Sequence, residues 1–120
     1  MVGMSEHLRA IPILPVHDMG AAVTFWSRLP SLTVDEYGDG GYAFVLHGEA
    51  EVVRLALFPD LDVTGNHAGC YVHLPDIDQR YAECVDADLP VSEIRDEPWG
   101  MREFRLTDPS GNVLRIGCVL

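Results

Sequence analysis

The sequence repeats its pattern of apolar and polar residues at a spacing of 58 residues. Asp18 and Asp76 each follow a short apolar stretch and precede an amphipathic one, and the same spacing relates Thr33 to Val91. Each copy is predicted to form one strand, one helix and three further strands. The repeat therefore predicts two similar halves that pack on each other, because one half alone has too few elements to bury its sheet.

Apolar residues at helical spacing predict two helices, which begin at the capping residues Asp18 and Asp76. Pro30 ends the first helix. The apolar face of the first helix comprises Met19, Ala22, Val23, Trp26 and Leu29. The apolar face of the second comprises Ile77, Tyr81, Cys84 and Val85. The predicted strands are 10–16, 33–37, 42–46, 52–58, 69–74, 91–95, 102–107 and 113–119.

The 120 residues are expected to form a single α+β domain, 1–120. Repeat one covers about 9–58, a linker covers about 59–66, and repeat two covers about 67–119. We expect the two halves to form curved mixed sheets with a cleft between them. A cleft between two halves of one domain is a common place for a small-molecule site.

The charge of the chain argues against a nucleic-acid partner. The formal net charge is −11, from 19 acidic residues and eight basic ones, and all eight are arginine. Binding to a phosphate backbone requires a basic surface, which this composition does not supply. An acidic surface instead attracts cationic ligands.

The three cysteines, Cys70, Cys84 and Cys118, show no metal-binding spacing, and we expect reduced thiols. The first residues lack the basic and apolar segments of a signal peptide. No apolar run reaches the roughly 20 residues that span a membrane, so we expect a cytoplasmic protein with no membrane partner.

The stretch from Glu97 to Asn112 carries the most informative local pattern. Trp99 stands between a proline and a glycine and follows several acidic residues, which favours an exposed indole on a loop over an indole that fills the core. The sequence Asp-Pro-Ser-Gly-Asn, from Asp108 to Asn112, is typical of a hairpin turn between two strands.

The chain resembles the vicinal-oxygen-chelate superfamily over residues 9–117. The resemblance rests on the repeat and on two motifs. The motifs are Asp-Met-x-x-Ala-Val-x-Phe-Trp from Asp18 to Trp26, and Pro-Trp-Gly continuing to Asp-Pro-x-Gly-Asn between Pro98 and Asn112. The superfamily includes glyoxalase I, extradiol dioxygenases, fosfomycin-resistance enzymes and bleomycin-binding proteins. The second motif, with one extra residue here, most resembles that of the bleomycin-resistance proteins.

The resemblance implies four positions for metal ligands on the first and last strand of each half: Ile11, Leu57, Gly69 and Arg115. None of these side chains is a donor for a divalent cation, which binds imidazole, carboxylate or thiolate groups. We therefore expect no metal and no other cofactor. A shifted register that brings His67 to the Gly69 position would restore a metal ligand.

The resemblance also implies a groove in which aromatic side chains stack on a flat ligand. The aromatic positions that match are Tyr37, Tyr42, Tyr71 and Trp99, each of which could instead be an ordinary strand or core residue. An acidic rim that meets positive charge on the ligand, or else an ordinary solvated face, is expected from Asp35, Glu36, Asp39 and Glu97. Arg115 would repel a cationic ligand unless a carboxylate such as Glu103 pairs with it, and could instead bind an anionic or carbonyl group.

In the bleomycin-resistance proteins the groove lies at a dimer interface, and Pro12 matches a hinge proline there. The resemblance therefore implies a C2 homodimer in which the arm from Met1 to Ile11 exchanges between subunits.

The leading hypothesis is metal-free binding and sequestration of a bleomycin-family glycopeptide antibiotic, which confers resistance without catalysis. One alternative is a non-catalytic binder of another planar natural product, such as a quinoxaline or mitomycin-like compound. The other is a divalent-metal enzyme of the glyoxalase or dioxygenase type.

Overall fold

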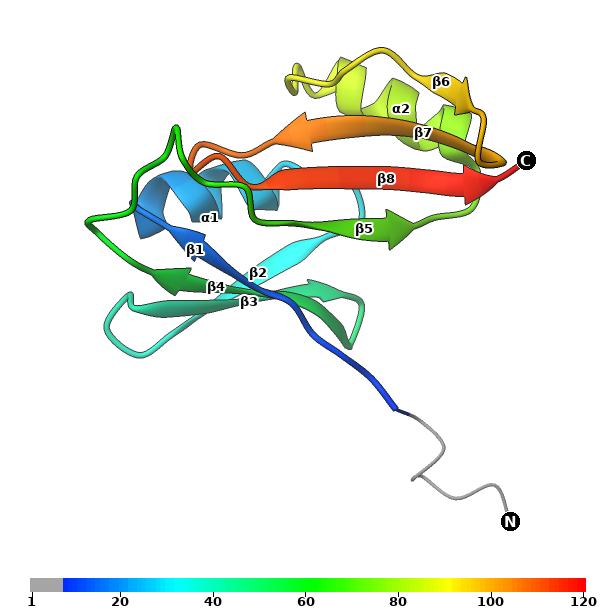
Figure 1. The fold of residues 1–120 in the computed structure, drawn as a ribbon. Coiled ribbons are helices and arrows are strands. Elements are labelled where there is room, and N and C mark those ends of the chain that lie inside the picture. The colour runs from blue at the N-terminus through cyan, green and yellow to red at the C-terminus, as the bar shows by residue number, and fades with distance from the viewer. Residues whose placement is uncertain (1–7) are drawn as a thin grey trace.

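The computed structural model describes residues 8–120 and shows two similar halves (Figure 1). The first half consists of β1 (Ile13–Val16), α1 (Met19–Ser27), β2 (Thr33–Tyr37), β3 (Tyr42–His47) and β4 (Ala50–Leu57). The second consists of β5 (Gly69–His73), α2 (Ile77–Asp86), β6 (Arg95–Glu97), β7 (Met101–Thr107) and β8 (Val113–Val119). The predicted repeat and α+β class are confirmed. Residues 1–7 of the predicted exchanging arm lie outside the described residues.

Each half forms a four-stranded mixed sheet with the same topology. The strand orders are β1-β4-β3-β2 and β5-β8-β7-β6. In both sheets the first strand of the half runs parallel to the last strand, and the other neighbours are antiparallel. Figure 1 shows the two sheets one above the other, joined by the segment between β4 and β5.

The register of the two sheets shows which positions correspond between the halves. Ile13 lies opposite Arg54, and its counterpart Tyr71 lies opposite Arg115. Arg54, rather than Leu57, is therefore the structural counterpart of Arg115. The spacing of 58 fails in the last strand because the β7–β8 turn, 108–112, is longer than the β3–β4 turn, 48–49.

A single core is shared by the two sheets and the two helices. It includes Leu55 of the first sheet, Phe104 and Leu114 of the second, and Trp26 of α1. The predicted burial of Trp26 is confirmed, and Phe25 is buried beside it. Val85 of α2, which was predicted on the apolar face, is half exposed, so that prediction is wrong. Each sheet has one face on this core, and we call the opposite face its outer face.

The Asp-Pro-Ser-Gly-Asn turn joins β7 to β8 as predicted, and three of its five residues are buried. Asp108, Ser110 and Asn112 are at most 4% exposed. The indole Nε1 of Trp26 donates to Asp108 Oδ2 at 3.1 Å, and Asn112 Nδ2 donates to the carbonyl oxygen of Pro15 at 2.8 Å. The turn is therefore the polar junction through which the second half is attached to the first.

Two local predictions are wrong. The strand expected at 91–95 is reduced to a single bridge at Val91, and β6 begins only at Arg95. The hydroxyl of Ser92 accepts a hydrogen bond from the backbone N–H of Arg105 at 2.7 Å. That N–H is therefore not available to a backbone carbonyl in a regular β-ladder. Asp76 precedes α2 but has a left-handed backbone (φ 55°) and makes no side-chain capping bond.

The three cysteines are unpaired, as expected. Burial raises the pKa of the Cys70 thiol and raises that of Cys84 to about 11, so both remain protonated at neutral pH. Among residues 8–120, no helix is long and apolar enough to cross a membrane.

Candidate functional site

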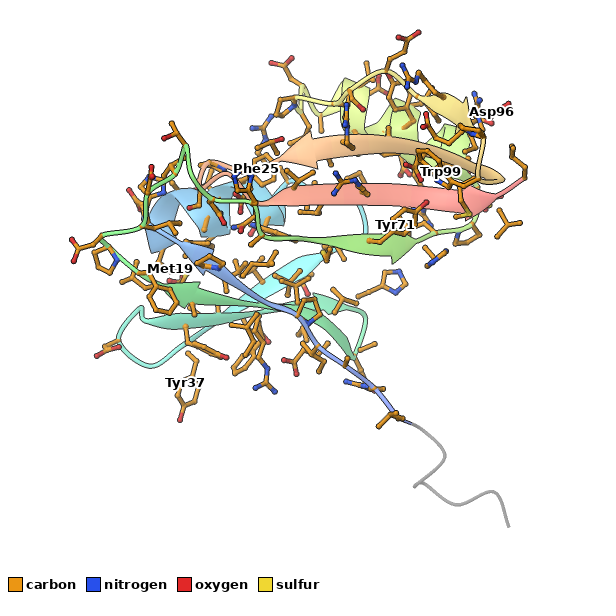
Figure 2. The ribbon with its side chains drawn as sticks, viewed as in Figure 1. Met19, Phe25, Tyr37, Tyr71, Asp96 and Trp99 are labelled. Atoms are coloured by element: carbon orange, nitrogen blue, oxygen red, sulfur yellow. The ribbon has the colours of Figure 1, made fainter. Side chains whose placement is uncertain are left out.

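The outer face of the second sheet presents Trp99 beside a buried carboxylate. Trp99 lies in the turn between β6 and β7, where Gly100 adopts a positive φ of 85° and donates its N–H to the carbonyl oxygen of Glu97. Its side chain is 62% exposed. The expected exposed, loop-mounted indole is therefore what the structure shows (Figure 2).

Glu103 of β7 organises the aromatic side chains of this face. Its Oε2 atom accepts a hydrogen bond from the Tyr71 hydroxyl at 2.6 Å and a longer one from Trp99 Nε1 at 3.3 Å. Glu103 itself is only 9% exposed. The carboxylate thus holds in one orientation the ring of Tyr71 from β5 and the ring of Trp99 from the β6–β7 turn, which lowers the entropy lost when a flat ligand stacks on them.

Tyr71 reaches Glu103 by crossing over Gly117 of β8. A Cβ atom at position 117 would overlap the Tyr71 hydroxyl, so only glycine leaves the space that the ring occupies. Partial burial, together with the hydrogen bond to Glu103, raises the pKa of Tyr71 to about 12. The phenol therefore remains a hydrogen-bond donor throughout the physiological pH range.

This pKa predicts how alkali affects stability. In an unfolded chain a tyrosine ionises near pH 10, whereas folded Tyr71 retains its proton to about pH 12. Its stabilising contribution is thus complete below about pH 10 and is lost between about pH 10 and 12. Between about pH 9 and 11, wild type is expected to lose roughly 0.2–1 kcal/mol more unfolding free energy than Tyr71→Phe. Urea unfolding at both pH values measures the difference, and equal losses would contradict the Tyr71–Glu103 contact.

Arg105 and Arg115 form a cationic pair on the same outer face. They lie opposite each other in the β7–β8 ladder, an arrangement in which like charges repel. Neither arginine belongs to any ion pair formed by residues 8–120. Glu103 accepts hydrogen bonds from Tyr71 and Trp99 and forms no ion pair with Arg115. Both arginines line a cavity of about 380 Å³ that also includes Trp99 and Glu97.

The outer face of the first sheet carries a second aromatic group. Tyr37 and Tyr42 each pack edge-on against Phe44, with ring centroids 6.0 and 5.7 Å apart. The guanidinium of Arg54 lies 5.4 Å from the centroid of the Phe44 ring and forms an ion pair with Glu51. Sequence reasoning identified the two tyrosines but missed Phe44 and Arg54. The alternation of side chains along β3 could have identified Phe44, because residues 42 and 44 lie on the same face of a strand.

The predicted site residues therefore fall into two groups on two different sheets. Tyr37 and Tyr42 lie on one outer face, and Tyr71, Trp99, Glu97 and Arg115 lie on the other. Within one chain the described residues show no contact or shared pocket between the groups, because the common core separates the sheets. Glu36 pairs with the buried Ala43 and so belongs to the opposite face of β2 from Tyr37.

The positions that the resemblance assigns to metal ligands do not suit a divalent cation. A Cβ atom at Gly69 would overlap the backbone carbonyl oxygen of Val113, so this backbone leaves no space for a ligating side chain there. Arg54 and Arg115, which correspond between the halves, bear positive charge. Within 8–120, no three His, Cys, Asp or Glu side chains lie together as a metal site, so His67 belongs to no such group.

Comparisons with known proteins agree with this architecture. The family model of the Glyoxalase/Bleomycin resistance protein/Dioxygenase superfamily matches residues 6–116. A bleomycin-binding protein crystallised with bleomycin is 22% identical, with a TM-score of 0.81 over 94% of this chain and 99% of the other. A bleomycin-binding protein from bleomycin-producing Streptomyces verticillus, crystallised with copper(II)-bleomycin, is 26% identical, with a TM-score of 0.74 over 97% of each chain.

An enzyme has a similar fold. Lactoylglutathione lyase from Agrobacterium tumefaciens is 18% identical, with a TM-score of 0.73 over 92% of each chain. No curated protein sequence matches the chain. The fold is thus shared by binding proteins and by at least one protein named as an enzyme.

Proposed function

Because the chain belongs to the Glyoxalase/Bleomycin resistance protein/Dioxygenase superfamily, we propose that it is a metal-free binding protein that sequesters a bleomycin-family glycopeptide antibiotic and so confers resistance. The observation that carries this proposal is the exposed Trp99 held beside Tyr71 by the buried carboxylate of Glu103. Exposed, oriented aromatic rings suit the stacking of a flat heteroaromatic group.

Catalysis is not part of the proposal. Lewis-acid chemistry requires a cation held by several donor side chains, and the positions where relatives would hold one carry Gly69 and the cationic Arg115. Sequestration requires no bond to form or break. Only affinity is needed, and the two aromatic faces can supply it.

A homodimer would complete the binding groove. Tyr37 and Tyr42 lie on one sheet and Trp99 lies on the other, so two chains must meet for these rings to face each other. We propose that the outer face of the first sheet packs on the outer face of the partner's second sheet, which gives two grooves per C2 dimer.

Calorimetry with metal-free and copper-loaded bleomycin tests the function. Wild type is expected to bind at micromolar or lower concentration, and Trp99→Ala to bind about ten- to hundredfold more weakly, because one stacking ring is lost. Val85→Ala is a matched control, since Val85 is also exposed but lies on α2. An absence of binding at millimolar ligand would reject the proposal, as would equal binding by Trp99→Ala.

The Arg105–Arg115 pair favours a second candidate. Two neighbouring cations without ion-pair partners among residues 8–120 oppose a cationic tail and suit a ligand with a carbonyl or anionic group. Another planar natural product, of quinoxaline or mitomycin type, would fit that description. A thermal-shift screen of these compounds beside bleomycin distinguishes the candidates, because the compound that binds raises the unfolding midpoint.

A further inference from the structure

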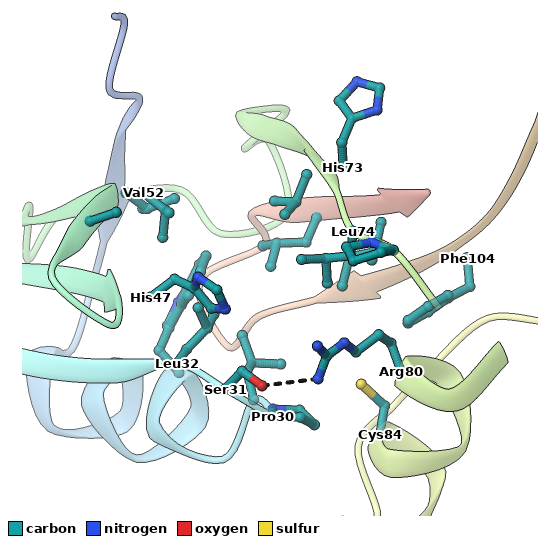
Figure 3. Close-up of a pocket in the computed structure, with 18 residues that line it drawn as sticks. Pro30, Ser31, Leu32, His47, Val52, His73, Leu74, Arg80, Cys84 and Phe104 are labelled. Carbon is teal, nitrogen blue, oxygen red and sulfur yellow. Dashed lines mark hydrogen bonds between the residues drawn. The ribbon is translucent and has the colours of Figure 1, made fainter. Parts of the chain in front are cut away.

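A partly enclosed cavity lies between the two halves, on the core side of both sheets. Its volume is about 260 Å³, and Figure 3 shows the residues that line it. Most of its walls are apolar, with Leu32 and Val53 from the first half and Val72, Leu74 and Phe104 from the second. This volume far exceeds the roughly 10–15 Å³ that one buried water needs and approaches the lower end of ligand pockets, at about 300 Å³.

Arg80 is the only arginine or lysine among the residues that line this cavity. It extends from α2 toward the first half, where its Nη1 atom donates to the Ser31 hydroxyl at 3.0 Å (Figure 3). Nη1 also forms an ion pair with Glu83 Oε1 at 3.3 Å, one turn along α2. Every hydrogen bond from this guanidinium to the described residues is made by Nη1.

The other edge of the guanidinium has no partner among residues 8–120. Nε is buried and makes no hydrogen bond, the one such buried side-chain atom in this part of the chain. An unsatisfied buried donor costs about 1–3 kcal/mol, and more when it is charged. Nε and Nη2 form the planar edge to which a carboxylate binds through both oxygens.

We propose that this cavity is a second binding site, separate from the aromatic faces, which takes a small monocarboxylate with an apolar body. The carboxylate accepts hydrogen bonds from Nε and Nη2 of Arg80, and the apolar body occupies the space between Leu32, Val72 and Phe104. A neutral alcohol would satisfy the donors less well, because its single oxygen cannot accept from Nε and Nη2 in the parallel, two-oxygen geometry of a carboxylate and carries no opposite charge. A cation would be repelled.

The site contacts both halves of the molecule. Ser31 and Val53 come from the first half, and Arg80, Cys84 and Phe104 come from the second. A carboxylate bound there links α2 to the segment after α1 and stabilises the packing of the halves. Ligand binding is therefore expected to raise the unfolding midpoint as well as to produce heat.

Octanoate and octanol are the matched probes, because they share an apolar chain and differ in charge. We expect saturable binding of one octanoate per wild-type chain in calorimetry, and at least tenfold weaker binding of octanol. Arg80→Gln is expected to weaken octanoate binding about ten- to hundredfold. The octanol comparison needs no variant, so the test holds even if Arg80→Gln folds poorly.

Two control variants separate the carboxylate site from general effects. Val85→Ala shortens an exposed side chain on α2, the helix that carries Arg80, and Val85 does not line the cavity. Arg105→Met removes an arginine from the outer face. Both are expected to bind octanoate within about threefold of wild type. The proposal is overturned if wild type shows no saturable octanoate binding, if octanol binds equally well, or if a folded Arg80→Gln binds octanoate like wild type.

Discussion

Replacing Asp108 by alanine is expected to lower the free energy of unfolding by about 3–5 kcal/mol. The Asp108 carboxylate is 4% exposed and accepts four hydrogen bonds. Oδ1 accepts hydrogen bonds from the backbone N–H groups of Ser110 and Asn112, and Oδ2 accepts them from Trp26 Nε1 and Asn112 Nδ2. Alanine leaves Trp26 Nε1 and the backbone N–H groups of Ser110 and Asn112 without this acceptor, while Asn112 Nδ2 keeps the carbonyl oxygen of Pro15. The junction between the halves thus loses its central group.

Asp18→Ala is the matched control for this prediction. Asp18 caps α1, is exposed, and its carboxylate accepts one bond, from Ala21 N at 3.0 Å. Loss of a cap of this kind typically costs about 1 kcal/mol. Urea unfolding of both variants at one protein concentration gives the comparison. If Asp108→Ala costs no more than Asp18→Ala, the buried turn does not hold the halves together.

The second large effect is expected at Gly69, where β5 begins. The Cβ atom of Gly69→Ala would overlap the carbonyl oxygen of Val113, and that oxygen belongs to the backbone of β8 and cannot rotate away. The β5–β8 ladder must shift, at a cost of about 3 kcal/mol or more, the upper end of the range for overpacking. A histidine or glutamate at this position would meet the same obstruction, so a metal ligand cannot be added here by substitution alone.

Gly41→Ala is the control for Gly69→Ala. A Cβ atom at Gly41 would lie 3.5 Å from Asp39 Oδ1, an ordinary contact, and the backbone of Gly41 does not have a positive φ. We expect a change within about 0.5 kcal/mol for this surface position. Equal stability of the two variants in urea unfolding would show that the backbone of β8 adjusts and that position 69 can accept a side chain.

Most elements of the fold could be predicted because their signals lie within a few residues of one another. The alternation in 33–37 and the turn residues after it predicted β2 with its observed bounds. The strand expected at 91–95 failed because a hydroxyl, that of Ser92, bonds to Arg105 thirteen residues later. The pattern of residues around Ser92 carries no information about a hydrogen-bond partner that lies so far along the chain.

The candidate site was predictable in composition but not in arrangement. Proline and glycine beside Trp99 indicated an exposed turn, and the structure shows one. Sequence reasoning named Glu103 as a carboxylate that could pair with Arg115, whereas in the structure it accepts hydrogen bonds from Tyr71 and Trp99. The Tyr71 contact depends on Gly117, which leaves room for the ring, and no motif marks that glycine.

The sequence by itself determined the repeat, the types of most elements and most of the side chains that face the core, because periodicity along the chain decides which side chains share a face. Only the tertiary structure showed that the Asp108 turn is the buried junction, that Arg54 corresponds to Arg115, and that Arg80 leaves one edge free in a cavity. These features depend on loop lengths and on contacts between segments far apart in the chain. Such contacts arise only when the two halves pack around one core.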